Sequence, residues 1–168
     1  ALKNAEGEYL GYVKKDMENG PEAVTGAMGI LTSLLYTRFC AGKFPLALVS
    51  MDNVSRNGKK LRQSVLETAQ IWAEKGLVDK AFLDYVQDES VVSFPWTMID
   101  KITPRPSEAV AQELAQSGVE GMDITVTSKQ TYIAPFVNAE EPGYLVIEDS
   151  FPNGRPPLEQ AGVYMTDR

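Results

Sequence analysis

The sequence predicts an α/β domain in which helices flank a mixed, largely parallel sheet, and three observations support this fold class. Helical patterns and short apolar runs alternate along the first two thirds of the chain. The run 44–49 is continuously apolar, which is typical of a strand covered on both faces in a parallel sheet. The last third is rich in Thr, Val, Ile and Tyr, which favours further strands over 123–136 and 143–151. We therefore expect one layered domain over 1–168.

Four segments are predicted to be helices from the spacing of their apolar residues and from their end signals: 20–43, 59–76, 77–89 and 106–118. In the first, Pro21 favours the start and Gly42 the end, and Cys40 is expected to pack beside the apolar face. In the second, one face is expected to carry Leu61, Val65, Ala69 and Trp72. Asp79 and Ser107 are expected to cap the third and fourth.

Charge and composition limit the partners that the chain can bind. The formal net charge is −7, and Lys and Arg are scattered among acids, which argues against a nucleic-acid or anionic-membrane surface. No apolar stretch approaches the ~20 residues that span a bilayer. The start of the sequence lacks the features of a signal peptide, and the single cysteine fits a reducing compartment. These features predict a cytoplasmic protein.

The residue types also limit the chemistry. With no histidine and one cysteine, no metal site is expected, and Ser–His or Cys–His catalysis is impossible within this chain. No G-x-G-x-x-G, P-loop or cluster of metal ligands occurs in the sequence.

The stretch SMDNVSRNG (50–58) follows the predicted strand 44–49 and has two interpretations. Ligands of open α/β sheets bind beyond the carboxyl ends of the strands, and the amide of Asn53 suits a substrate hydroxyl or a developing alkoxide. Alternatively, Asp52, Asn53 or Ser55 caps the next helix, and Asn57-Gly58 forms a tight turn. The residues alone leave both interpretations open.

The stretch FPWTMIDKITP places the carboxylate of Asp100 inside an apolar segment, where it needs a partner. Lys101 would point to the other face of an extended segment, so the default is a structural ion pair with another residue. In IEDSFPNGRPPLEQAG, Glu148 and Asp149 face opposite ways on a strand and make a poor acid–base pair. We expect structural roles for both of them and for Arg155.

These three stretches, in collinear order, resemble the polyol-specific long-chain dehydrogenases and reductases, a family that includes mannitol dehydrogenase, fructuronate (mannonate) reductase and tagaturonate reductase. The first is similar to S-C-D-N-x-x-x-N-G and the second to F-P-x-x-M-V-D-R-I-x-P. The third, LVIEDSFPNGRPPLEQAGV, is similar to W-V-I-E-D-x-F-x-x-G-R-P-x-L/W-E-x-A-G-V, with Leu145 at the place of the tryptophan. The resemblance covers nearly the whole chain, and three long matches are far more specific than a lone glycine motif.

The resemblance implies the second half of a Rossmann-like dinucleotide-binding domain and three site residues. Asn53 would bind the substrate carbonyl or hydroxyl and stabilise the alkoxide, and Asp100 would contact the sugar near the nicotinamide. Ile99 would lie against the nicotinamide ring of NAD or NADP. The family's dinucleotide fingerprint and its catalytic lysine, in a K-x-x-x-x-N-x-x-H pattern on a helical domain, do not occur in these residues. The 168-residue segment alone is therefore expected to be inactive and to need the helical catalytic domain of its own polypeptide.

The implied activity is hydride transfer at C2, which interconverts a ketose or keto-uronate with its polyol or aldonate. Fructuronate or tagaturonate is the favoured substrate because the variant loops resemble that branch, and fructose with mannitol comes next. A hypothesis from another class is a stand-alone, non-catalytic α/β domain that binds a sugar or a protein partner.

Overall fold

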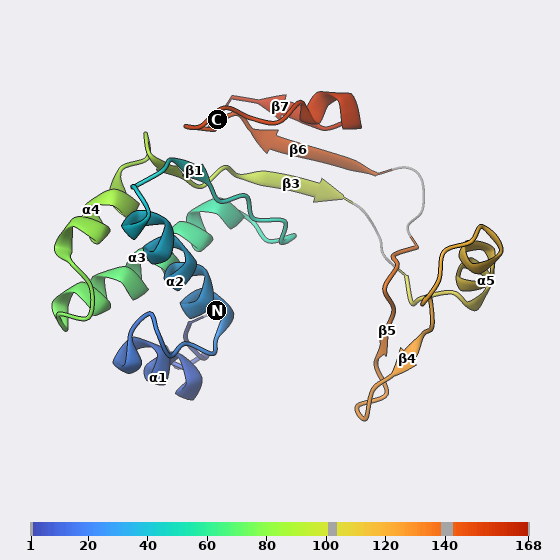
Figure 1. The fold of residues 1–168 in the computed structure, drawn as a ribbon, viewed down its shortest axis with the longest axis horizontal. Coiled ribbons are helices and arrows are strands. Elements are labelled where there is room, and N and C mark those ends of the chain that lie inside the picture. Colours follow the sequence, from blue (N-terminus) through green and yellow to red (C-terminus); the bar gives the residue numbers. More distant parts are fainter. Residues whose placement is uncertain (1, 101–103, 139–142, 168) are drawn as a thin grey trace. The chain divides into compact units, whose positions relative to one another are not determined.

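Helices dominate the first hundred residues of the computed structural model, which describes residues 2–100, 104–138 and 143–167 (Figure 1). The helices are α1 Gly11–Asn19, α2 Ala27–Cys40, α3 Asn57–Glu74, α4 Lys80–Gln87 and α5 Glu108–Gln116, with the 3-10 turn η1 at Leu158–Ala161. The strands are β1 Leu46–Ala47, β2 Val92–Ser93, β3 Thr97–Asp100, β4 Thr125–Val126, β5 Tyr132–Ile133, β6 Tyr144–Glu148 and β7 Tyr164–Thr166. The chain forms two compact units, Ala1–Met98 with Leu145–Arg168, and Ile99–Tyr144.

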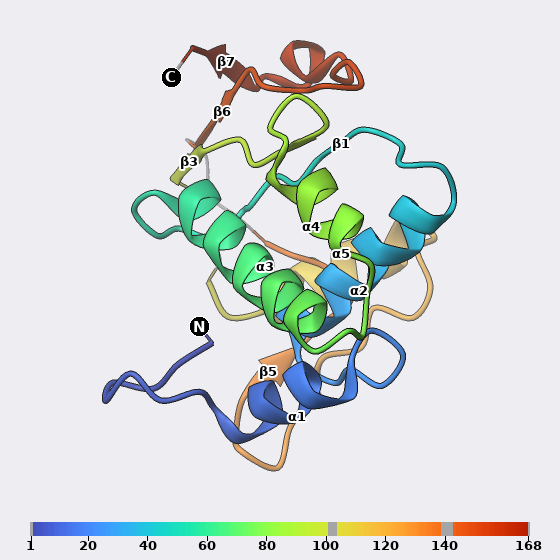
Figure 2. The same ribbon diagram turned by 90° about the vertical axis from the view of Figure 1, so that its left-hand side faces the viewer.

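The core of the first unit lies between α2, α3 and α4, which run side by side (Figure 2). As predicted, α3 buries Val65, Ala69 and Trp72 on one face. Phe82 of α4 is fully buried and packs edge-on against two aromatic rings of α2, those of Tyr36 and Phe39. This aromatic packing holds α2 against α4.

Helix α2 begins at Ala27, later than Pro21, because its N-terminus is capped from α1. The buried carboxylate of Asp16 accepts hydrogen bonds from the backbone N–H groups of Thr25 and Gly26, each at 2.8 Å. Gly26 is the N-cap residue of α2, so its N–H is one of the donors that a helix start leaves unsatisfied, and Thr25 directly precedes it. Sequence patterns did not predict α1, which supplies this cap.

The environment of Cys40 also differs from the prediction. The residue ends α2 and is exposed, so it does not pack beside the apolar face. The end of the helix brings its side chain to the surface.

Helix α4 begins as predicted, since the side chain of Asp79 accepts a hydrogen bond from the N–H of Ala81 at 2.7 Å. Ser107 precedes α5, but its side chain makes no capping hydrogen bond. In the described part of the chain, no helix is long and apolar enough to cross a membrane.

Two strand pairs of the first unit are parallel. β1 pairs with β2 in the register Leu46↔Val92 and Ala47↔Ser93, and β6 pairs in parallel with β7. The second sheet has the order β3-β6-β7, with β6 in the middle (Figure 1). The predicted strand 44–49 is paired over two residues only, and both are half-buried, so the expectation of a strand covered on both faces is wrong for this chain. In the second unit, β4 and β5 form an antiparallel hairpin.

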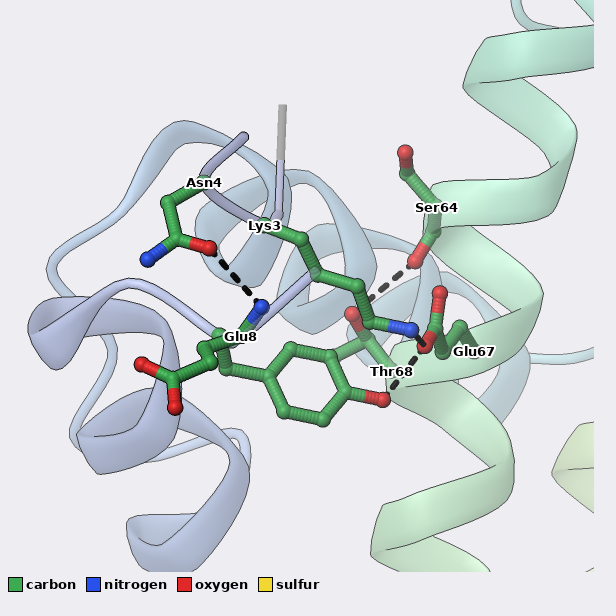
Figure 3. A network of polar contacts seen from close by, with 7 residues as sticks. Lys3, Asn4, Glu8, Ser64, Glu67 and Thr68 are labelled. Carbon is green, nitrogen blue, oxygen red and sulfur yellow. Dashed lines mark hydrogen bonds and ion pairs between the residues drawn. The ribbon is translucent and has the colours of Figure 1, made fainter. Parts of the chain in front are cut away.

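The N-terminal segment is attached to α3 by polar contacts (Figure 3). Lys3 and Tyr9 form an antiparallel bridge, and both side chains meet the carboxylate of Glu67, with Lys3 Nζ 2.6 Å from Oε1. Partial burial alone would raise the pKa of Glu67, but the hydrogen bonds from Lys3 and Tyr9 outweigh it and hold the pKa below its ordinary value of 4.5.

Candidate active site

The 50–58 stretch leaves β1 and enters α3, which begins at Asn57 and not at Lys59. The residue before the helix is Arg56, in the left-handed conformation with φ 56° and ψ 44°. The side chain of Arg56, the N-cap residue, makes no capping hydrogen bond. The interpretation that Asp52, Asn53 or Ser55 serves as the cap is therefore wrong.

Asn57 is the buried polar centre of this stretch, with 2% of its surface exposed. Its Nδ2 donates to Thr97 Oγ1 at 2.6 Å and to the Asp52 carbonyl at 2.9 Å. Its Oδ1 accepts from the N–H of Thr97 at 3.0 Å and from that of Gly58 at 2.7 Å. The predicted Asn57-Gly58 turn is therefore wrong, because the two residues start a helix that is bonded to β3.

Gly58 lets the start of α3 press against the segment between β2 and β3. A Cβ atom at this position would lie 2.4 Å from the carbonyl oxygen of Phe94 and 2.7 Å from that of Pro95. Both neighbours are backbone atoms and cannot move aside cheaply. Glycine is therefore required at position 58 because the backbone of residues 94 and 95 lies so close, and not because the chain turns there.

Asn53 lies on the exposed part of the loop, four residues before Asn57. Within the described ranges 2–100, 104–138 and 143–167, its carboxamide makes no hydrogen bond, so both amide hydrogens and the oxygen are available to a ligand. Its neighbour Asp52 is engaged through its backbone carbonyl, which accepts from Asn57 and from the N–H of Val54.

Asn53 lines a cavity of about 770 Å³ in the first unit. The loop residues 53–56 form one wall, residues 96–98 a second, and residues of β6, with the end of β7 and Asp167 after it, form the rest. The charged groups of the lining are Arg56, Glu148 and Asp167. Its size lies in the range of small-molecule sites, and it combines apolar surface from Trp96 and Met98 with a few polar groups.

Glu148 closes one side of this cavity and is bound to the sheet. Its Oε2 accepts a hydrogen bond from the N–H of Trp96 at 2.9 Å, and its own N–H donates to the Trp96 carbonyl at 2.9 Å. Arg155 pairs with Asp149 and with Glu159, so it ties the 149–159 loop together as expected. These contacts support structural roles for the acidic pair and for the arginine.

Ile99 and Asp100 end β3 and belong to the second unit, where Ile99 is half-buried and Asp100 exposed. The structural ion pair expected by default for Asp100 is not formed with any residue that the structure describes, and Lys101 lies outside the described residues. The structure joins Asn53 to the 96–98 segment through a common cavity, while the contacts of Ile99 and Asp100 with a ligand stay a prediction.

Sequence reasoning missed the roles of Asn57, Thr97 and Arg56. A usable signal for Asn57 was the second asparagine of the S-x-D-N-x-x-x-N-G pattern, which was interpreted as a turn. Across the residues that the structure describes, no group of three or more His, Cys, Asp or Glu side chains could hold a metal ion.

Comparisons with known proteins agree with this architecture. The model of the family described as "Mannitol dehydrogenase Rossmann domain" matches residues 14–160. A D-mannonate oxidoreductase of Thermotoga maritima is 53% identical over 169 residues, which cover 99% of this chain and 31% of that protein. The D-mannonate oxidoreductase of Escherichia coli is 32% identical over 151 residues, covering 89% of this chain and 27% of its own length.

Two solved structures are similar throughout the chain. One is a D-sorbitol dehydrogenase in substrate-free form, with a TM-score of 0.72 and 28% identity over 99% of this chain and 31% of that chain. The other is Pseudomonas fluorescens mannitol 2-dehydrogenase in a ternary complex with NAD and D-mannitol, with a TM-score of 0.71 and 28% identity over 98% of this chain and 30% of that chain. The chain thus spans about a third of the length of these relatives. The predicted fold class is confirmed, and the chain belongs to the mannitol dehydrogenase Rossmann domain family.

Proposed function

We propose that the full-length protein containing this chain is an NAD(P)-dependent oxidoreductase that acts at C2 of a sugar acid. It would interconvert a keto-uronate, fructuronate or tagaturonate, with its aldonate. Membership of the family and the 53% identity with a D-mannonate oxidoreductase support this reaction class. The observation that carries the proposal is the unbonded carboxamide of Asn53, which lines a cavity of about 770 Å³.

Asn53 would bind the reacting oxygen. As the carbonyl is reduced, negative charge develops on that oxygen, and an amide N–H held next to it stabilises the charge. Because Asn53 makes no hydrogen bond inside the described part of the chain, it needs no rearrangement to donate. Asp100, exposed at the end of β3, would bind hydroxyls of the sugar chain.

The cofactor would be NAD or NADP, as in the mannitol 2-dehydrogenase complex with NAD. When bound, it supplies the hydride. Ile99 presents a half-buried aliphatic side chain, which fits the flat face of a nicotinamide ring. The sequence lacks the glycine-rich fingerprint that binds the phosphates of a dinucleotide, so the residues of this chain fit only the nicotinamide end of the cofactor. In this proposal, another part of the polypeptide binds the cofactor phosphates.

Arg56 favours a sugar acid over a neutral sugar. Its side chain lines the cavity beside Asn53, and it forms no ion pair with any carboxylate that the structure describes. A guanidinium binds a carboxylate through two parallel hydrogen bonds. Fructuronate and tagaturonate carry such a carboxylate, whereas fructose does not.

The test is the activity of the full-length protein with fructuronate, tagaturonate and fructose, followed by the loss of NADH or NADPH absorbance. We expect turnover with a keto-uronate at a higher kcat/KM than with fructose. Absence of turnover with all three sugars and both cofactors would refute the proposed function.

A further inference from the structure

We propose that Asn57 and Thr97 form a positioning pair that holds the carboxamide of Asn53 in its reactive place. This inference rests on the proposed function of Asn53. Neither member of the pair has to touch the reacting atoms for it to act, because both bind the backbone of the loop that carries Asn53.

The loop is held at two carbonyls, one on each side of Met51. The hydroxyl of Thr97 donates to the Ser50 carbonyl at 2.6 Å. The Asn57 amide donates to the Asp52 carbonyl at 2.9 Å, one peptide bond before Asn53. Inside the loop only local bonds are present among described residues, such as that from the Val54 N–H to the Asp52 carbonyl. The position of Asn53 therefore depends mainly on these two bonds, one of which comes from β3, 47 residues away from Ser50.

The two side chains also bind each other, so they act as one unit. Asn57 Nδ2 donates to Thr97 Oγ1 at 2.6 Å, which leaves the hydroxyl hydrogen free to go to Ser50. Asn57 Oδ1 accepts from the N–H of Thr97 at 3.0 Å. Asn57 is 2% exposed, so water does not replace these partners. Through the pair, the loop after β1 is bonded directly to the first residue of β3.

Accurate placement is what such a pair contributes to catalysis. A donor acts on a developing alkoxide only within hydrogen-bond distance, and a misplacement of about 1 Å can lower the rate ~100-fold. Loss of one bond in the pair should therefore act on turnover more than on the binding of the cofactor. A purely structural pair would instead change the melting temperature alone.

The experiment compares Thr97→Val with Thr97→Ser in the full-length enzyme. Valine keeps the shape of the side chain and removes the hydroxyl, whereas serine keeps the hydroxyl. The control is Thr68→Val, which removes a buried threonine hydroxyl of α3 that lies beside α1 and away from the cavity, and that donates to the Ser64 carbonyl at 3.0 Å. We measure kcat and KM for the keto-uronate, KM for the cofactor, and the hydrogen exchange of the amides of residues 50–56.

We expect Thr97→Val to lower kcat about 10- to 100-fold with an unchanged cofactor KM, and to speed exchange across 50–56. Thr97→Ser should recover most of the turnover, and Thr68→Val should leave both readouts near wild type. Normal turnover in Thr97→Val, or an equal loss in Thr97→Ser, would overturn the proposal. If the wild-type enzyme reduces no sugar, the proposed function fails. Unchanged exchange in Thr97→Val would then still overturn the positioning pair.

Discussion

Single residues set the character of the cavity beside the 50–58 loop. Asn53 offers an unbonded amide, and Arg56 offers a cation that no described carboxylate neutralises. Arg56 adopts a left-handed backbone conformation, which costs a non-glycine residue on the order of 1 kcal/mol. Such conformations concentrate at functional sites, which agrees with a role for this loop in binding.

Arg56→Met should separate sugar acids from neutral sugars. The substitution keeps an unbranched side chain and removes the charge, so KM for the keto-uronate should rise at least ~10-fold, because one charge-assisted interaction is lost. KM for fructose should stay within about twofold of wild type. Lys59→Met is the control, since Lys59 is exposed on the first turn of α3 and does not line the cavity. Equal changes for both sugars would contradict a carboxylate-binding role.

Gly58→Ala should destabilise the protein strongly. The added methyl group would clash with the carbonyl oxygens of Phe94 and Pro95, so we expect a loss of about 3 kcal/mol in the free energy of unfolding. Gly11→Ala is the matched control, because Gly11 starts α1 and nothing lies within 4 Å of its added Cβ. Thermal melting of both variants checks the prediction, and similar melting temperatures would contradict the close approach at Gly58.

At the scale of elements, local patterns predicted the parts whose causes are local. The faces of α3 and the start of α4 followed from apolar spacing and from the Asp79 cap. The start of α2 could not be predicted, because its cap comes from Asp16, nine and ten residues upstream of its partners. The role of Asn57 was hidden for the same reason, since its partner Thr97 lies 40 residues away. Strand β7 is three residues long and was not predicted, because so short a strand leaves too weak a pattern.

The N-terminal segment should detach from α3 in acid. The folded-state pKa of Glu67 lies below its ordinary 4.5, so its contribution to stability is complete above that value and is lost as the pH falls through 4.5 toward the folded pKa. Glu67→Gln should therefore melt below wild type at about pH 6, and this difference should shrink by about pH 3. The melting temperatures of both proteins across this range test it. A difference that does not depend on pH would show that the charge of Glu67 is unimportant.

At the scale of the whole molecule, we propose that the chain contributes one side of the active site. The chain belongs to the mannitol dehydrogenase Rossmann domain family and contains the residues around Asn53. Its sequence contains neither a glycine-rich phosphate fingerprint nor a histidine. The expectation of one domain over 1–168, the second half of a dinucleotide-binding domain, stays a prediction beside the two compact units of the structure. Sequence motifs were sufficient to place the family, because three long stretches matched in order. They could not show the cavity, which residues far apart in sequence build together.

The 168-residue chain alone should have no dehydrogenase activity. It lacks the groups that would bind the cofactor phosphates and donate the proton, so we expect no change in NADH or NADPH absorbance with fructuronate, tagaturonate or fructose. The full-length protein assayed in parallel is the positive control. Measurable turnover by the chain alone would show that its own residues complete the site.

The turnover of Asn53→Asp in the full-length enzyme tests the central claim most directly. Asparagine donates to the developing alkoxide, whereas aspartate cannot donate and repels it, so kcat should fall ~100- to 1,000-fold while cofactor KM stays near normal. Because Asn53 is exposed and makes no hydrogen bond within the described residues, the melting temperature should hardly change. Asn53→Ala should lower kcat in the same way. A fully active Asn53→Asp enzyme would contradict the catalytic role of Asn53.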